Sequence, residues 1–192
     1  MERDTFILAA GAFLAVLLQL VLAPNIALFS AMPNFCMIYA LIAAITRPAG
    51  NAALLVAFAF GMLFDLLGNA PVGAMAFLLV LAAFGASRVF TVLNNDTLFM
   101  PLAIFIVAVF LVEVFYAVFM VSTGIAASLL EALVLRALPC AFYNCAVGLP
   151  LLAFVRRLFD EPGRPSSRAH DSMHVSLTSG KNLGKVRTKH RF

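Results

Sequence analysis

Apolar residues fill this chain in six long runs that are separated by short polar or turn-forming segments. A helix needs about 20 mostly apolar residues to cross the hydrocarbon core of a bilayer, which is about 30 Å thick. Each run therefore predicts a membrane-crossing helix, although the second is short. The predicted helices cover residues 6–23, 34–46, 52–67, 72–90, 99–121 and 139–154. The pattern predicts an all-α fold: a polytopic integral membrane protein built as a six-helix transmembrane bundle.

Composition supports this class and divides the chain into two parts. Hydrophobic residues make up 64% of the 192 residues and charged residues 11%, which leaves too little polar surface to cover a soluble globule. Residues 1–159 form the predicted transmembrane domain, and residues 160–192 form a basic, disordered cytoplasmic tail. The first run has 18 residues after a leader without net side-chain charge, so we expect a retained helix rather than a cleavable signal.

The positions of Lys and Arg predict the orientation, because cytoplasmic loops are enriched in these residues. Arg3, Arg47, Arg88 and nine basic residues from Arg156 onward fall on one side of the predicted bundle, and only Arg136 falls on the other. Both termini are therefore expected in the cytoplasm. The net charge of +4 follows from this topology and the tail, and it does not indicate nucleic-acid binding.

Asp65 places a carboxylate inside the third apolar run. An acid at the centre of a membrane helix opposes insertion by about 2.5–3.5 kcal/mol, and by less near an end, so such residues usually face protein or water. The turn that follows contains Gly68, Asn69, Pro71 and Gly73, residue types that end one helix and begin the next. Two interpretations remain open: Asp65 is a structural partner for nearby backbone, or it is a charge on a rigid outward hairpin that binds a partner protein.

Glu113 lies near the middle of the fifth run and needs a hydrogen-bond partner or a proton. Arg88 and Arg136 are the candidate partners by residue type, although both are predicted at helix ends. The first interpretation is a structural hydrogen bond between helices, and the second is a proton or ligand site.

Other polar residues inside the apolar runs are predicted to form hydrogen bonds between helices, because polar side chains in membranes pair across helices. These residues are Gln19, Asn34 and Asn144. Residues 128–138 form a helical pattern with two charges before Pro139. We slightly favour an interfacial helix for this segment over the first part of a long, kinked sixth helix.

Motifs for catalysis or metal binding are missing from the sequence. It contains no Gly-x-Ser-x-Gly elbow, no His-Glu-x-x-His pair and no phosphate-binding loop. The three cysteines lie in apolar surroundings, and the three histidines fall in the tail without the spacing of metal ligands. We therefore expect no enzymatic activity, no metal and no cofactor.

Residues 58–73, FAFGMLFDLLGNAPVG, resemble the signature of the rod shape-determining MreD family of bacterial inner-membrane proteins. The resemblance extends over residues 6–158 and leaves out the tail. Other segments agree with the family in order, and they are Leu17-Leu18-Gln19, Pro33-Asn34, Leu111-Val112-Glu113, Tyr143-Asn144, Pro150 and Arg156-Arg157. Family patterns often have Asp where this chain has Glu113.

The resemblance implies a non-enzymatic component of the cell-elongation (rod-shape) machinery in the bacterial inner membrane. Such a protein works beside MreC and links the MreB filament to the synthases of peptidoglycan synthesis. The family fold resembles the substrate-binding subunits of energy-coupling-factor transporters. That likeness supplies the alternative function, a small-molecule-binding subunit of a transporter with an outward cavity lined by Asp65, Asn69 and Glu113. A lipid-facing scaffold is a third class.

The basic tail supplies one further expectation about partners. Five basic residues fall within its last part, and they are Lys181, Lys185, Arg187, Lys189 and Arg191. Each basic group near an anionic leaflet contributes about 1 kcal/mol. The tail is therefore either a binding segment for anionic lipids or a solvated, disordered extension.

Overall fold

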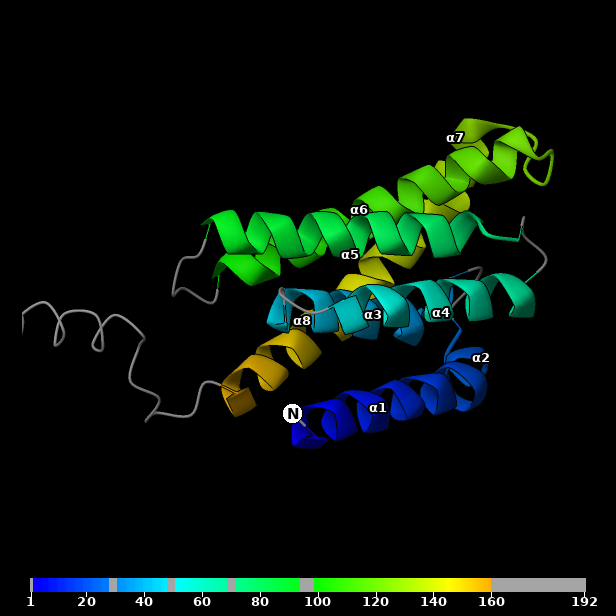
Figure 1. Cartoon of the computed structure of the whole chain (residues 1–192). Coiled ribbons are helices and arrows are strands. Elements are labelled where there is room, and N and C mark those ends of the chain that lie inside the picture. Colours follow the sequence, from blue (N-terminus) through cyan, green and yellow to red (C-terminus); the bar gives the residue numbers. More distant parts are fainter. Residues whose placement is uncertain (1, 28–30, 48–50, 69–71, 94–98, 160–192) are drawn as a thin grey trace, which may run out of the picture. The chain divides into compact units, whose positions relative to one another are not determined.

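The computed structural model describes residues 2–27, 31–47, 51–68, 72–93 and 99–159, which are helical apart from short connections (Figure 1). The elements in chain order are α1 (Glu2–Leu17), η1 (Leu18–Leu22), α2 (Ala23–Asn25), α3 (Phe35–Thr46), α4 (Asn51–Leu67), α5 (Ala74–Leu93), α6 (Phe99–Ser122), α7 (Leu129–Ala132), η2 (Leu133–Ala137) and α8 (Leu138–Phe159). The short elements η1 and η2 are π-helical turns inside longer helices.

The described residues form six helical segments, because α1, η1 and α2 follow one another directly and so do α7, η2 and α8. Each segment matches one predicted apolar run. Four of them are long and apolar enough to cross a membrane, and these cover Phe6–Asn25, Ala74–Leu93, Phe99–Ser122 and Leu129–Arg157. The prediction of six full-length crossings is therefore supported for four helices, whereas α3 and α4 are shorter apolar helices.

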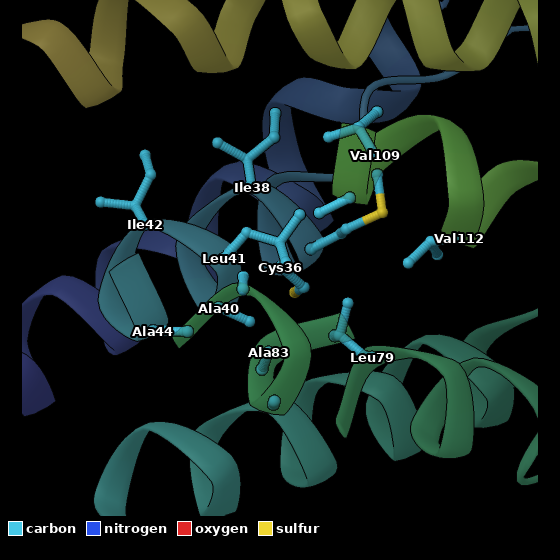
Figure 2. Packing of buried hydrophobic residues seen from close by; sticks show 14 of the residues in the cluster. Cys36, Ile38, Ala40, Leu41, Ile42, Ala44, Leu79, Ala83, Val109 and Val112 are labelled. Atoms are coloured by element: carbon cyan, nitrogen blue, oxygen red, sulfur yellow. The ribbon is translucent and has the colours of Figure 1, made fainter. Parts of the chain in front are cut away.

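Helix α3 forms the centre of the bundle. Ten of its twelve residues are buried, because its sequence is apolar on every face and needs protein or lipid all around it. It packs against α1, α4, α5 and α6. Figure 2 shows its side chains, Ile38 and Leu41 among them, in one cluster with Leu79 of α5 and Val109 of α6.

Three glycines allow neighbouring helices to approach closely. A Cβ atom added to Gly61 of α4 would collide with the backbone of Ala76 on α5, and one added to Gly148 of α8 would collide with the Phe105 ring of α6. A Cβ atom on Gly11 of α1 would lie 2.7 Å from the Tyr39 ring of α3. Gly61 therefore lets two helix backbones come together, as small residues do in other membrane bundles, whereas Gly148 and Gly11 make room for an aromatic ring of the neighbouring helix.

The segment before Pro139 is continuous with the last helix. Ser128 caps the start of α7 by accepting a hydrogen bond from the Glu131 N–H (3.2 Å), and the helix then runs without interruption to Phe159. Ala132 and Ala137 pack against Ala117 of α6. The favoured interpretation, a separate interfacial helix, is therefore wrong, because this segment buries its small residues against the bundle.

The chain divides into two compact units, residues 1–156 and 157–192. Of the second unit the structure describes residues 157–159, which complete α8. The predicted basic tail, residues 160–192, lies outside the described residues.

Candidate functional site

Asp65 is almost completely buried, with 1% of its surface exposed. Its Oδ2 atom accepts hydrogen bonds from the N–H groups of Gly73 (2.9 Å) and Ala76 (3.2 Å), and its Oδ1 atom accepts one from the N–H of Met75 (3.1 Å). These donors lie at the start of α5, where backbone N–H groups have no partner within the helix. Asp65 on α4 therefore caps the next helix, and the positive end of that helix dipole favours its negative charge.

The turn between these helices is placed in part. The N–H of Gly68 donates to the carbonyl of Phe64 (3.0 Å) and closes the last turn of α4. Gly73 has a φ angle of 95°, a left-handed conformation that glycine adopts without steric cost. Asn69 and Pro71, two predicted site residues, lie outside the described residues. A cap for the start of α5 is supplied by Asp65, a residue of the preceding helix.

A second polar cluster joins four helices through the predicted residues Gln19, Asn34, Glu113 and Asn144, all of which are buried. The Nδ2 of Asn144 on α8 donates to Oε1 of Glu113 on α6 (2.9 Å). Its Oδ1 accepts from the N–H of Asn34, which precedes α3 (2.7 Å). The Oε1 of Gln19, in η1, accepts from the N–H of Phe35 (2.8 Å).

This cluster satisfies the first backbone donors of α3. The N–H groups of Asn34 and Phe35 bind side chains of other helices, and the N–H of Met37 donates to Oδ1 of Asn34 (2.9 Å). Non-helical backbone inside a membrane bundle needs such partners, because water is not there to provide them. The central helix can therefore begin inside the bundle, after the irregular segment that contains Asn34.

Glu113 also lies on the wall of a cavity of about 490 Å³. Asn34, Glu131 and Arg136 contribute polar groups to the same wall. The rest of the lining is mainly apolar and includes Phe64 and Met75, which flank the hairpin capped by Asp65, as well as Met32, Met120, Ile125, Leu135 and Cys140. Among the described residues, Asp65 is not part of this lining, whereas Glu113 shares the wall with Asn34 and Arg136.

Arg136 is the cation associated with this cavity. It interacts electrostatically with Glu113, its guanidinium carbon lies 5.0 Å from the centre of the Tyr116 ring, and its Nη1 contacts the sulfur of Met120 (2.7 Å). Contacts of this kind hold a guanidinium over an aromatic face. Arg88, the other candidate partner for Glu113, lines a different pocket near the far end of α5.

Sequence reasoning named Arg136 as a candidate partner of Glu113, and the two residues do lie on one wall. It missed Glu131 on the same wall, because residues 128–138 were placed at the interface. The signal that could have placed them is the small-residue pattern Ala132 and Ala137, which indicates close packing on another helix. Among the described residues no group of three or more His, Cys, Asp and Glu side chains could hold a metal ion.

Several helices long and apolar enough to cross a bilayer, with buried polar contacts between them, define a multi-pass membrane protein. Residues 4–161 match the family model described as rod shape-determining protein MreD, and the chain belongs to this family. The resemblance inferred from the sequence is thereby confirmed over nearly the same residues. No curated protein and no solved structure matches the chain, so the expected likeness to energy-coupling-factor subunits has no support from a solved structure.

Proposed function

We propose that this protein is a non-enzymatic component of the cell-elongation machinery in the bacterial inner membrane, where it links MreC to the peptidoglycan synthases and, directly or indirectly, to the MreB filament. Membership of the MreD family over residues 4–161 is the observation that carries this proposal. It is supported by the buried polar contacts between helices, which hold the bundle together.

The hairpin between α4 and α5 is the proposed contact with a partner protein. Asp65 fixes its geometry from inside, since its carboxylate binds three backbone N–H groups and is not available at the surface. The side chains on the described flanks are apolar and exposed, namely Leu66, Leu67 and Val72. We therefore assign Asp65 and Gly73 a positioning role and the exposed flanks the contact itself, because exposed apolar groups can be buried by a partner.

The orientation is part of the same proposal. Arg47 and Arg88 lie at the end of the bundle where α3 ends and α5 approaches its C-terminus, and Arg136 lies near the C-terminal end of α6. The positive-inside rule then predicts both termini in the cytoplasm and the Asp65 hairpin outside.

A single cysteine at Asn69 should react with an impermeant thiol reagent in intact cells, whereas one at Ser166 should not. Reversed labelling would overturn the orientation.

Affinity purification of the tagged chain from its native membrane, with and without crosslinking, tests the function. We expect MreC and wall synthases to be recovered. Val72→Asn should weaken this recovery without lowering protein abundance, because it places a polar amide on the proposed contact surface. Val92→Asn is the matched control, since Val92 is also exposed and lies at the opposite end of α5. Equal recovery with both variants would remove the hairpin from the contact surface.

The cavity around Glu113 supports a second candidate function, a small-molecule-binding subunit of a transporter. A volume of about 490 Å³ with Glu113 and Arg136 on an otherwise mainly apolar wall is typical of pockets that bind small molecules. The same purification separates the two candidates, because recovery of ATPase subunits in place of MreC would favour transport.

A further inference from the structure

The cavity of about 490 Å³ has charges of both signs on an otherwise mainly apolar wall. Glu113 comes from α6, Glu131 from α7 and Arg136 from η2. Met32 and Ile125 also line the cavity, and their side chains are 45% and 46% exposed. The cavity is therefore open along this rim, and a small molecule can reach its charged groups from outside the bundle.

Glu113 has one carboxylate oxygen left for an occupant of the cavity. Its Oε1 atom accepts the hydrogen bond from the Nδ2 of Asn144 (2.9 Å), whereas its Oε2 atom has no hydrogen-bond partner among the described residues. The Oε2 atom is also not among the fully buried polar atoms that lack a partner. It is therefore open to the cavity, where it can accept a hydrogen bond from a ligand.

The guanidinium group of Arg136 is held in place without a carboxylate partner among the described residues. Its carbon lies 5.0 Å from the centre of the Tyr116 ring, and its Nη1 contacts the sulfur of Met120 (2.7 Å), which is a weak acceptor. Arg136 interacts electrostatically with Glu113, but no ion pair joins the two side chains. A guanidinium has five N–H donors, so several remain for the oxygen atoms of a ligand.

A cation and a carboxylate that share one wall without pairing are costly, because charges taken out of bulk water need partners. A ligand with one ammonium group and one carboxylate satisfies both residues. Its ammonium donates to the Oε2 of Glu113, and its carboxylate accepts two parallel N–H bonds from Arg136. A purely anionic ligand would be repelled by Glu113, and a purely cationic one by Arg136.

The rest of the wall selects the body of the ligand. It is formed mainly by apolar side chains, among them Phe64, Met75, Met120 and Leu135. Methionine side chains adapt to irregular apolar groups because they are unbranched and flexible. These residues favour a zwitterion that carries an apolar side chain.

We propose that this cavity binds an amino acid with an apolar side chain, with its carboxylate on Arg136 and its ammonium group on Glu113. The ligand class rests on the second candidate function, because it concerns the same cavity. The first candidate function, in cell elongation, does not depend on it.

Calorimetric titration of the purified full-length chain in detergent, with L-leucine and with D-leucine, tests the proposal. Two analogues keep the apolar side chain of leucine and remove one charge each: isopentylamine lacks the carboxylate, and isocaproate lacks the ammonium group. Loss of a hydrogen bond between charged groups weakens binding by roughly tenfold or more. One enantiomer of leucine should therefore bind about tenfold more tightly than either analogue.

Two variants test the two ends of the ligand separately. Arg136→Gln should abolish the preference for leucine over isopentylamine. Glu113→Gln keeps the acceptor for Asn144 and should abolish the preference for leucine over isocaproate. Each variant is compared with itself on two ligands, so a partly unfolded sample does not produce the expected pattern. Arg88→Gln is the matched control, because Arg88 is exposed and lines a different pocket, and it should bind leucine as the wild-type chain does.

Three results would overturn the proposal. Neither enantiomer of leucine binds to the wild-type chain, isocaproate or isopentylamine binds as tightly as leucine, or Arg88→Gln weakens binding as much as Arg136→Gln. None of these results changes the recovery of MreC and wall synthases, which tests the elongation role, or the recovery of ATPase subunits, which tests transport. Failure of the ligand class can therefore be distinguished from failure of either candidate function.

Discussion

Asp65 and Glu113 are both buried carboxylates in apolar helices, but their partners differ in kind. Asp65 binds three backbone N–H groups at the start of α5, whereas Glu113 accepts a hydrogen bond from the side chain of Asn144 and lines a cavity with Arg136. Backbone donors cannot be removed or rearranged by a side-chain change, and side-chain donors can. Substitutions of the two acids should therefore have different effects. Changes at Asp65 should lower the stability of the protein, whereas changes at Glu113 should mainly alter binding in the cavity.

The largest expected effect comes from Asp65→Ala, which leaves three backbone N–H groups in a buried place without an acceptor. Each such group costs about 1–3 kcal/mol, so the free energy of unfolding should fall by roughly 3 kcal/mol or more. Asp65→Asn keeps one acceptor oxygen and should lose roughly 1–3 kcal/mol. The stability of both variants can be measured by thermal denaturation in detergent and by their steady-state abundance. Leu66→Ala, on an exposed neighbour, is the control, and a wild-type melting temperature for Asp65→Ala would refute the capping role.

The close approach of α4 and α5 beside Asp65 predicts the next effect. An added methyl group in Gly61→Ala would collide with the backbone of Ala76, one of the groups that Asp65 caps, and overpacking of this kind costs about 1–3 kcal/mol. Gly85→Ala on α5 is the matched control, because open space surrounds that position and alanine favours a helix over glycine by about 0.5–1 kcal/mol. Thermal denaturation should therefore give a lower melting temperature for Gly61→Ala and a higher one for Gly85→Ala. Equal shifts in the two variants would contradict the close packing of α4 on α5.

Asn144→Leu tests the side-chain half of the comparison. The variant has similar size, but it removes the acceptor for the Asn34 N–H and the donor for Glu113. A buried group left unsatisfied costs about 1–3 kcal/mol, so we expect a loss of roughly 2 kcal/mol in the free energy of unfolding. Phe142→Leu, on an exposed position of the same helix, should be nearly neutral. A neutral Asn144→Leu would mean that the cluster does not hold α3.

Glu113→Gln should have the smallest effect on stability. The amide oxygen can still accept the hydrogen bond from Asn144, and the change in the free energy of unfolding should stay within about 1 kcal/mol. Partner recovery and cell shape, measured at equal abundance, then report on the charge itself. A loss of stability as large as that of Asp65→Asn would remove the contrast between the two acids.

The positions of the helices could be read from the sequence because hydropathy is a local signal. The predicted run 52–67 and the observed α4, Asn51–Leu67, differ by one residue at the start. The sequence was less informative about whether α3 crosses the membrane. Its twelve residues form a helix only about 18 Å long, and its position depends on the helices packed around it.

The partners of the polar residues could not be predicted, because they depend on tertiary contacts. Sequence alone identifies Asp65 as an unusual acid, but its role as a cap on α5 depends on the turn that brings Gly73 to Ala76 back to it. The bond between Asn34 and Asn144 joins residues that are 110 positions apart. No periodicity in the chain contains that information.

The bonds at the start of α3 have a consequence for how the protein is made. Residue 34 leaves the ribosome long before residue 144, so the acceptor for the Asn34 N–H does not yet exist when α3 first reaches the membrane. A short helix with an open, polar start is costly to leave in lipid, and contacts between distant residues form late because their loops must close first. Insertion of the central helix is thus completed only by the last helix of the bundle, and a chain truncated before α8 should be recognised by the cell as unfinished.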